Sequence, residues 1–270
     1  MTAVLGIDAA WTAKNASGYA LVEKRNGRWR LRAAAPNLRG FARKCGLDCH
    51  EEGLSQALHC AMRGLGGRKP DLIAVDMPMS RIDIVGRRVS DIGVSKRFGA
   101  AKCATYSPSA ERPGKISGPF RAACEAQGYE LLVLGKELPA FSLAEVYPHP
   151  ALLRLMNAEE RLRYKVGKTK IYWPKASTEE RRQAVLTSLR SIVEALDGII
   201  SNVSECVEPA FAATKGFAAL KPAEDMIDAI VSAWIGTTIL EGRAEAFGDM
   251  DSAIWIPRPL EPAAALAGAA

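Results

Sequence analysis

Residues 3–8 read AVLGID, residues 18–22 read GYALV and residues 29–33 read WRLRA, and these three stretches decide the expected fold. Each shows the apolar run or the alternation that is typical of a β-strand. Residues 14–18 supply the first turn between them, and Asn26-Gly27 is a strong hairpin signal in the second. The first 35 residues are therefore predicted to form three consecutive strands joined by turns.

The remaining sequence predicts helices and strands in alternation. Helices are expected over residues 51–65, 120–127, 178–196 and 223–240 and from Pro150 onward. Strands are expected over 71–76 and 142–146, with an edge strand at 254–256 because Pro257 ends it. Residues 79–141 are rich in Gly, Ser and Pro and read as an irregular insertion around the helix at 120–127. This order matches a ribonuclease-H-like α/β fold, a mixed sheet of three antiparallel strands plus parallel strands flanked by helices.

Length and composition are those of a globular protein. The 270 residues are 48% hydrophobic and 24% charged, enough for one domain over residues 1–258 with an alanine-rich tail over 259–270. The sequence has no run of about eighteen apolar residues and no signal-peptide pattern, so no membrane partner is expected. Six cysteines in a chain this long do not suggest a disulfide framework, which leaves the cytoplasm as the expected compartment.

The charge balance permits an acidic partner. Lys and Arg exceed Asp and Glu by 36 − 30 = 6, and the isoelectric point is near 9.0. Nucleic acid or a phosphorylated ligand fits this balance, although an ordinary basic protein has it too. Residues 161–175 combine basic side chains with aromatic ones and contain no acid: Arg161, Arg163, Lys165, Lys168, Lys170 and Lys175, with Tyr164, Tyr172 and Trp173. That mixture suits single-stranded nucleic acid, and a solvated basic loop is the alternative.

Single carboxylates close two of the predicted strands. Asp8 ends the first strand and Asp76 ends the fourth, just before Met77-Pro78. An ionised carboxylate at the edge of a core is costly unless it is paired or binds a cation. These two strands would be neighbours in the expected fold, so Mg²⁺ or Mn²⁺ could relieve the repulsion between the two acids. A strand end that simply reaches solvent is the ordinary explanation for either acid alone.

Three further acids and one histidine join this constellation. Asp225 and Asp228 are three residues apart on the last long helix and so share one face. Asp225 also suits the start of a helix, whereas Asp228 precedes a run that must be buried. Glu145 lies at the end of the strand over 142–146, close to His149, for which a proton shuttle and a helix cap are the two interpretations.

Six short motifs resemble, in order and spacing over residues 4–257, the DUF429 family of predicted ribonuclease-H-like nucleases. They are Gly6-Ile7-Asp8, Ser17-Gly18-Tyr19, Ala74-Val75-Asp76-Met77-Pro78, Arg87-Arg88-Val89-Ser90-Asp91, Glu145-Val146-Tyr147-Pro148 and Asp225-Met226-Ile227-Asp228-Ala229. The last motif is also similar to a helix of Holliday-junction resolvases.

The resemblance implies a metal-dependent phosphodiester nuclease in which Asp8, Asp76 and Asp228 hold two Mg²⁺ or Mn²⁺ ions about 4 Å apart. Asp76 departs from the resolvases, which have Glu at this place. Arg87 and Arg88 are candidates to hold the phosphate, with surface solubility as the alternative.

Other interpretations stay open at this point. A small-molecule phosphotransferase of the actin-like ATPase type shares this sheet and its first Asp, but only one copy of the three-strand signature is present. A non-catalytic scaffold of the same fold that binds nucleic acid or protein is the third possibility. A zinc site is suggested by a cluster in non-standard spacing: Cys45, Cys49, His50, His59 and Cys60.

Overall fold

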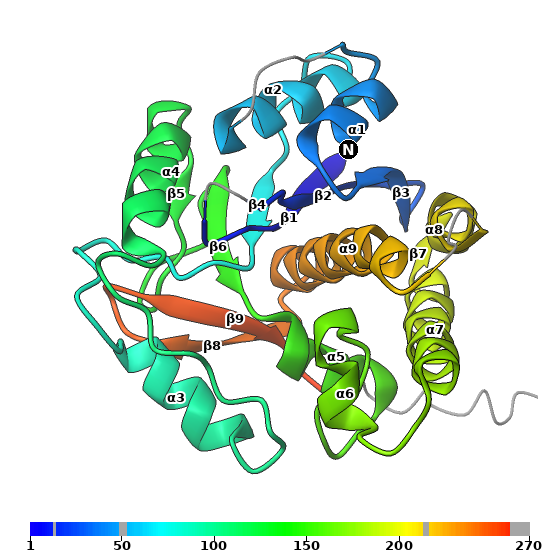
Figure 1. Ribbon diagram of the computed structural model, residues 1–270. Coiled ribbons are helices and arrows are strands. Elements are labelled where there is room, and N and C mark those ends of the chain that lie inside the picture. The colour runs from blue at the N-terminus through cyan, green and yellow to red at the C-terminus, as the bar shows by residue number, and fades with distance from the viewer. Residues whose placement is uncertain (13–14, 49–52, 213–215, 260–270) are drawn as a thin grey trace, which may run out of the picture.

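A mixed β-sheet with helices on both faces forms the centre of the protein (Figure 1). The computed structural model describes residues 1–12, 15–48, 53–212 and 216–259. Within these ranges the sheet has nine strands: β1 (Thr2–Asp8), β2 (Gly18–Arg25), β3 (Arg28–Ala35), β4 (Leu72–Val75), β5 (Glu130–Leu131), β6 (Ser142–Val146), β7 (Ile200–Ser201), β8 (Ala244–Gly248) and β9 (Ala253–Pro257). Their order is β7-β3-β2-β1-β4-β6-β9-β8, and β5 pairs with β6.

The strand directions divide the sheet into two parts. β1, β2 and β3 form an antiparallel meander, while β4 is parallel to β1, β6 is parallel to β4, and β9 is parallel to β6. The carboxyl ends of β1, β4 and β6 therefore meet at one edge of the sheet. The mixed α/β sheet that the sequence predicts is confirmed.

Helices cover the two faces of the sheet with separate cores. One face packs against α1 (Leu38–Lys44), α2 (Leu54–Gly64) and α4 (Gly114–Ala126). The other packs against α5 (Pro148–Met156), α7 (Thr178–Asp197), α8 (Val203–Ala212) and α9 (Lys221–Leu240). α3 (Val89–Phe98) packs against β8 and β9, and α6 (Thr169–Tyr172) packs against α7. Short 3₁₀ turns at Val166–Lys168 and Ala218–Leu220 precede α6 and α9.

α9 lies unusually close to β1 and β2 because glycines line the contact. A Cβ atom placed on Gly6 would lie 2.4 Å from the carbonyl oxygen of Ala229, and one on Gly18 would lie 2.3 Å from that of Asp225. From the helix side, a Cβ on Gly236 would lie 2.5 Å from a methyl group of Val4. Real Cβ atoms do not approach this closely, so only glycine permits the observed distance between helix and sheet.

The edge-strand prediction for residues 254–256 is wrong. β9 pairs with β6 on one side and with β8 on the other. Pro257 is tolerated because it is the last residue of the strand, opposite Ala244 at the end of the ladder. The sequence analysis missed β8, since AEAFG has no β-branched residue.

The prediction of an irregular segment over residues 79–141 is also wrong in part. α3, α4 and β5 lie within it, and α4 begins at Gly114 rather than at Phe120. Gly118 and Pro119 lie inside α4 and disfavour a helix, so the part before Phe120 was not predicted. The other predicted elements are present with slightly different ends, and α1, α6 and α8 were not predicted. Most of the predicted tail, residues 260–270, lies outside the described residues.

The helices of the described residues were also compared with the length of a bilayer crossing. None of them combines the length and the apolar character that a membrane span requires.

Replacing Gly6 by Ala should destabilise the protein by about 2 kcal/mol, since the added methyl group overlaps the backbone of α9. Urea denaturation followed by circular dichroism measures this change. Gly93→Ala on α3 is the matched control, because its methyl group would meet Phe247 at an ordinary 3.5 Å and the stability should change by less than about 1 kcal/mol. Equal effects of the two substitutions would contradict the close contact at Gly6.

Candidate acidic site

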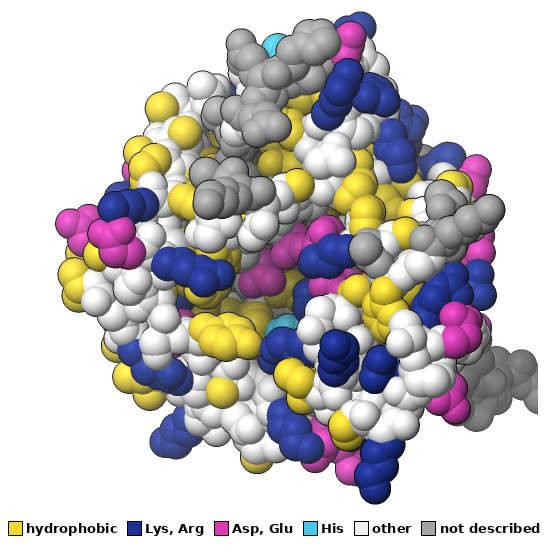
Figure 2. Space-filling view, viewed as in Figure 1, with side chains coloured by type: hydrophobic (Ala, Val, Ile, Leu, Met, Phe, Trp, Pro, Cys, Tyr) yellow, Lys and Arg dark blue, Asp and Glu magenta, His cyan; other side chains and the backbone are white. Residues whose placement is uncertain are grey.

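The carboxyl ends of β1 and β4 bring two aspartates together. Ile7 lies opposite Val75, and the backbone N–H of Asp76 donates to the carbonyl of Ile7 at 2.9 Å. Because side chains alternate along a strand and Gly6 faces α9, Asp8 faces α9 as well, and Asp76 follows it on the same side. Figure 2 shows Asp and Glu side chains at the bottom of a hollow near the centre of one face, with Lys and Arg side chains around its rim.

The first turns of α9 add three more carboxylates. Asp225 is half-buried, whereas Glu224 and Asp228 are buried, with 2% and 0% exposure. The contacts of Gly6 and Gly18 with the backbone of α9 hold this part of the helix over the end of β1. The sequence analysis missed Glu224, although its position four residues before Asp228 puts both on one helical face.

Asp8 and Asp76 are half-buried carboxylates at the end of their strands. Among the residues that the structure describes, neither side chain accepts a hydrogen bond or forms an ion pair. Burial raises the pKa of Asp8 well above its ordinary value, with a further increase from the negative charge of Asp228. Burial also raises the pKa of Asp76, to about 7, against the opposing effect of Lys165. Two such acids are a costly arrangement that a cation would relieve.

Asp228 is held by two residues of the basic segment. The hydroxyl of Tyr164 donates to its Oδ1 at 2.7 Å, and the Nζ of Lys165 bonds to its Oδ2. Burial alone would lower the pKa of Lys165, but Asp228, Tyr164, Glu224 and Asp8 outweigh it and raise this pKa well above its ordinary value. Lys165 therefore stays charged among the acids.

Glu224 fastens the same segment to the helix. Its Oε2 accepts the backbone N–H of Val166 at 2.6 Å, and its Oε1 lies 2.9 Å from the Nζ of Lys221 and 3.4 Å from that of Lys165. Lys221 also bonds to Asp225. Glu224 and Asp225 thus share Lys221 as a counter-charge, whereas Asp228 pairs with Lys165.

Glu145 points to the opposite face of the sheet from Asp8 and Asp76. It lies opposite Val75 in the register, so the alternation places its side chain on the other side from that of Asp76. There its two carboxylate oxygens accept hydrogen bonds from Arg88 at 2.6 and 2.7 Å and from the N–H of Met79 at 2.7 Å. The predicted acidic constellation is therefore divided between the two faces, and Glu145 has its own buried partner.

Arg88 and Arg87 differ sharply in their surroundings. The Arg88 side chain is 8% exposed and bridges Glu145 and Asp91, with three hydrogen bonds from its guanidinium and backbone to the Asp91 carboxylate. This position differs from the phosphate contact that the sequence suggested, since its donors are already used. Arg87 is exposed, and its guanidinium donates to the hydroxyls of Ser95 and Ser107 and to the carbonyl of Asp91.

His149 is buried behind Tyr164. Its Nε2 contacts Arg161, and its Nδ1 lies 3.5 Å from the hydroxyl of Tyr164, which in turn bonds to Asp228. Burial lowers the pKa of His149 well below its ordinary value, and Lys165 and Arg161 lower it further. The imidazole is therefore neutral at pH 7 and reaches the acids only through Tyr164.

The basic segment 161–175 is only partly a surface. Arg163, Lys170 and Lys175 are exposed, but Tyr164 is fully buried, which corrects its place in a stacking surface for nucleic acid. Tyr172 and Trp173 are half-buried. An exposed aromatic ring that the sequence analysis missed lies nearby: Tyr106, 64% exposed, whose hydroxyl accepts from Lys168 at 3.1 Å.

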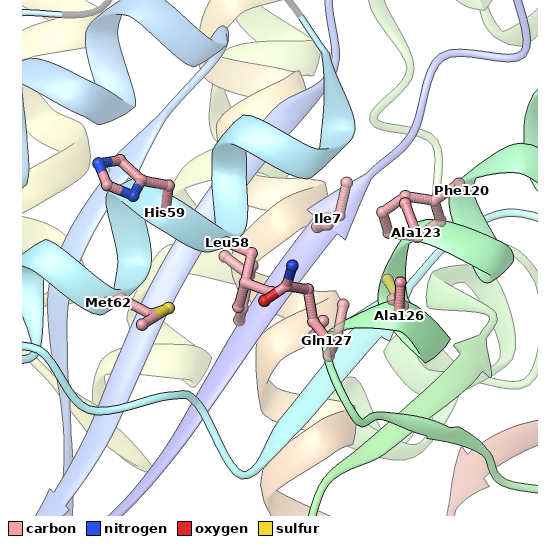
Figure 3. A pocket seen from close by; sticks show the side chains of 11 residues that line it. Ile7, Leu58, His59, Met62, Phe120, Ala123, Ala126 and Gln127 are labelled. Atoms are coloured by element: carbon pink, nitrogen blue, oxygen red, sulfur yellow. The ribbon is translucent and has the colours of Figure 1, made fainter.

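A separate cavity of about 430 Å³ lies on the other face of the sheet, between α2 and α4 (Figure 3). Leu5, Ile7 and Ile73 line it, and they alternate along their strands with the residues that face α9. Its polar side chains are His59, at the margin in Figure 3, and Gln127. The sheet separates this mainly apolar cavity from the acids.

Among the described residues of the predicted zinc cluster, no three side chains form a metal-ligand set. Cys45 and Cys60 are buried, and burial raises the pKa of the Cys45 thiol to about 12. His59 is exposed, and Cys49 and His50 lie outside the described residues.

The sequence model of a family described as "Protein of unknown function (DUF429)" matches residues 6–253. No curated protein matches the chain.

Replacing Asp76 by Asn should stabilise the metal-free protein at pH 8. The pKa of this carboxyl is about 7 in the folded state and about 4 when unfolded, so the folded state binds more protons between these values and stability falls as the pH rises through them. The gain from Asn should be near zero at pH 4, grow up to pH 7 and then stay constant, at about 1 kcal/mol or more. Urea denaturation in EDTA at pH 4, 6 and 8 measures it, and a gain that does not vary with pH would contradict the raised pKa.

Replacing Arg88 by Met should destabilise the protein by about 3 kcal/mol or more, because Glu145 and Asp91 would then be buried without their counter-charge. The neighbouring substitution Arg87→Met removes an exposed side chain of the same size and should cost less than about 1 kcal/mol. Denaturation midpoints of the two variants give the comparison. Similar losses in both would show that the buried ion pairs of Arg88 add nothing.

Proposed function

The chain belongs to the DUF429 family, and we propose that it is a metal-dependent phosphodiester hydrolase, a nuclease, that works through Asp8, Asp76 and Asp228. The observation that supports the proposal most directly is the pair of carboxylates at the ends of β1 and β4, which no described residue engages and which lie beneath the acids of α9. Buried carboxylates with strongly raised pKa values are typical of functional sites.

We also propose that the fold is of the ribonuclease-H-like class. The supporting features are the antiparallel meander β1-β2-β3, the parallel strands β4 and β6 on the other side of β1, and an acid at the carboxyl end of β1. A fold alone does not determine an activity, so the proposed function depends on the site.

The residues at the site fit Mg²⁺ or Mn²⁺. Both ions prefer carboxylate oxygens, and Asp8 and Asp76 offer oxygens that no described residue engages. Among the residues that the structure describes, no three such side chains already form a metal-ligand set. Asp228 is instead bonded to Tyr164 and Lys165.

Each part of the site has a distinct task in this proposal. When bound, the divalent ions would activate water and stabilise the leaving oxygen of the phosphodiester. Asp8, Asp76 and Asp228 hold the ions, and Glu224 and Tyr164 position the segment that covers the acids. The buried pairs between Arg88, Glu145 and Asp91 fix the loop after β4 against β6.

Nucleic acid is the substrate class that the surroundings favour. Exposed Arg87, Lys170 and Tyr106, together with half-buried Lys168, offer phosphate contacts and a ring on which a base can stack. Lys and Arg side chains around the hollow in Figure 2 would attract a polyanion toward the acids.

Asp8→Asn should keep the fold and lower the rate of metal-dependent cleavage by about 100-fold or more, since it removes the carboxylate at the centre of the site. The measurement compares wild type and variant in Mg²⁺ or Mn²⁺ on single-stranded, duplex and branched DNA and on RNA. Asp251→Asn, on the exposed turn between β8 and β9, is the control and should cleave like wild type. Unchanged cleavage in Asp8→Asn would remove Asp8 from the mechanism.

The same assay separates the other two functions. A phosphotransferase of the actin-like ATPase type would turn over ATP and leave every polynucleotide intact. A non-catalytic scaffold would bind nucleic acid in a gel-shift experiment and cleave nothing with either metal. Either result would overturn the nuclease proposal.

A further inference from the structure

Lys165 is the cation at the centre of the acidic site. Its Nζ bonds to Oδ2 of Asp228 and lies 3.4 Å from Oε1 of Glu224. Its positive charge also opposes the burial that raises the pKa of Asp8 and of Asp76. The amine is therefore close enough to act on both strand acids. One lysine thus interacts with every acid that the proposed function assigns to metal.

We propose that Lys165 is an exchangeable cation: it neutralises Asp228 in the metal-free protein and must release this carboxylate before a divalent ion can bind Asp8, Asp76 and Asp228 together. The inference rests on the proposed function, because it concerns how the same site takes up its metal.

The backbone around Lys165 lets this exchange occur without unfolding. Tyr164 is anchored by its hydroxyl to Oδ1 of Asp228, and Val166 is anchored by its N–H to Oε2 of Glu224. Tyr164 is completely buried, whereas the Lys165 side chain keeps 20% exposure and so has an open side toward solvent. The flexible four-carbon arm of a lysine can therefore swing away while the residues on either side stay in place.

The distribution of charge explains why the exchange is needed. Lys221 serves Asp225 and Glu224 and leaves Lys165 as the partner of Asp228. Both oxygens of Asp228 are engaged at once, by Tyr164 and Lys165, so a metal ion can use Oδ2 only after Lys165 leaves. Metal binding must break this ion pair. Removing the lysine should therefore increase the affinity for metal.

Titration of Mn²⁺ by calorimetry into the full-length protein tests the inference with three proteins. Lys165→Met removes the competing charge and should bind Mn²⁺ at least fivefold more tightly than wild type. Lys175→Met is the matched control, because it removes the same charge from an exposed position in the same basic segment. Its affinity should stay within twofold of wild type.

The possible results separate the inference from the proposed function. Tighter binding in Lys165→Met alone supports the exchange, and so does binding in this variant when wild type binds no Mn²⁺. Unchanged or weaker binding in Lys165→Met, or equal tightening in both variants, overturns the exchange while the metal site stands. Absence of binding in all three proteins overturns the metal site and the exchange with it.

A second measurement on wild type guards against a variant that does not fold. Reductive methylation followed by mass spectrometry reports how accessible each lysine amine is. The amine of Lys165 should be protected in EDTA and become reactive when Mn²⁺ is added, while exposed Lys170 reacts equally in both conditions. Protection of Lys165 that Mn²⁺ does not change, at a concentration that saturates the site, would overturn the exchange.

Discussion

The close contact between α9 and the first two strands is the constraint on which the rest of the structure depends. Gly6 and Gly18 leave room for the helix backbone at distances that no side chain allows. The helix is in turn buried along most of its length, with Trp234 fully enclosed. Because this contact fixes the height and direction of α9, it also fixes the place of Glu224, Asp225 and Asp228 above the end of β1.

The buried charges on the two faces of the sheet differ in how they are paired. On one face, Arg88 satisfies Glu145 and Asp91 through short hydrogen bonds, which stabilises the loop that follows β4. On the other face, Asp8 and Asp76 have no described partner, and Asp228 is held by Tyr164 and Lys165. The first arrangement holds the fold together, whereas the second concentrates negative charge where a ligand can balance it.

Much of this architecture could be predicted from the sequence, because strands that end in a single acid and a helix with two acids one turn apart are local patterns. The face of the sheet on which Glu145 lies could not be predicted, because it depends on the register between β4 and β6. That register pairs Glu145 with Val75 rather than with Asp76. The place of Lys165 could not be predicted, since it depends on the path of a loop that Glu224 fastens from nearly sixty residues away. The first half of α4 was missed because Gly118 and Pro119 disfavour a helix in a propensity argument.

The separation of the two halves of the site along the chain has a consequence for biosynthesis. Asp8 and Asp228 are 228 − 8 = 220 residues apart, and α9 covers β1 and β2 from near the end of the chain. A nascent chain leaves the ribosome with its first strands early and acquires their helical cover late. During that interval the apolar face that will meet α9, including Val4, Ala20 and Val22, has no native partner. Production of this protein in cells should therefore depend on chaperones that shield the first strands until α9 has been made.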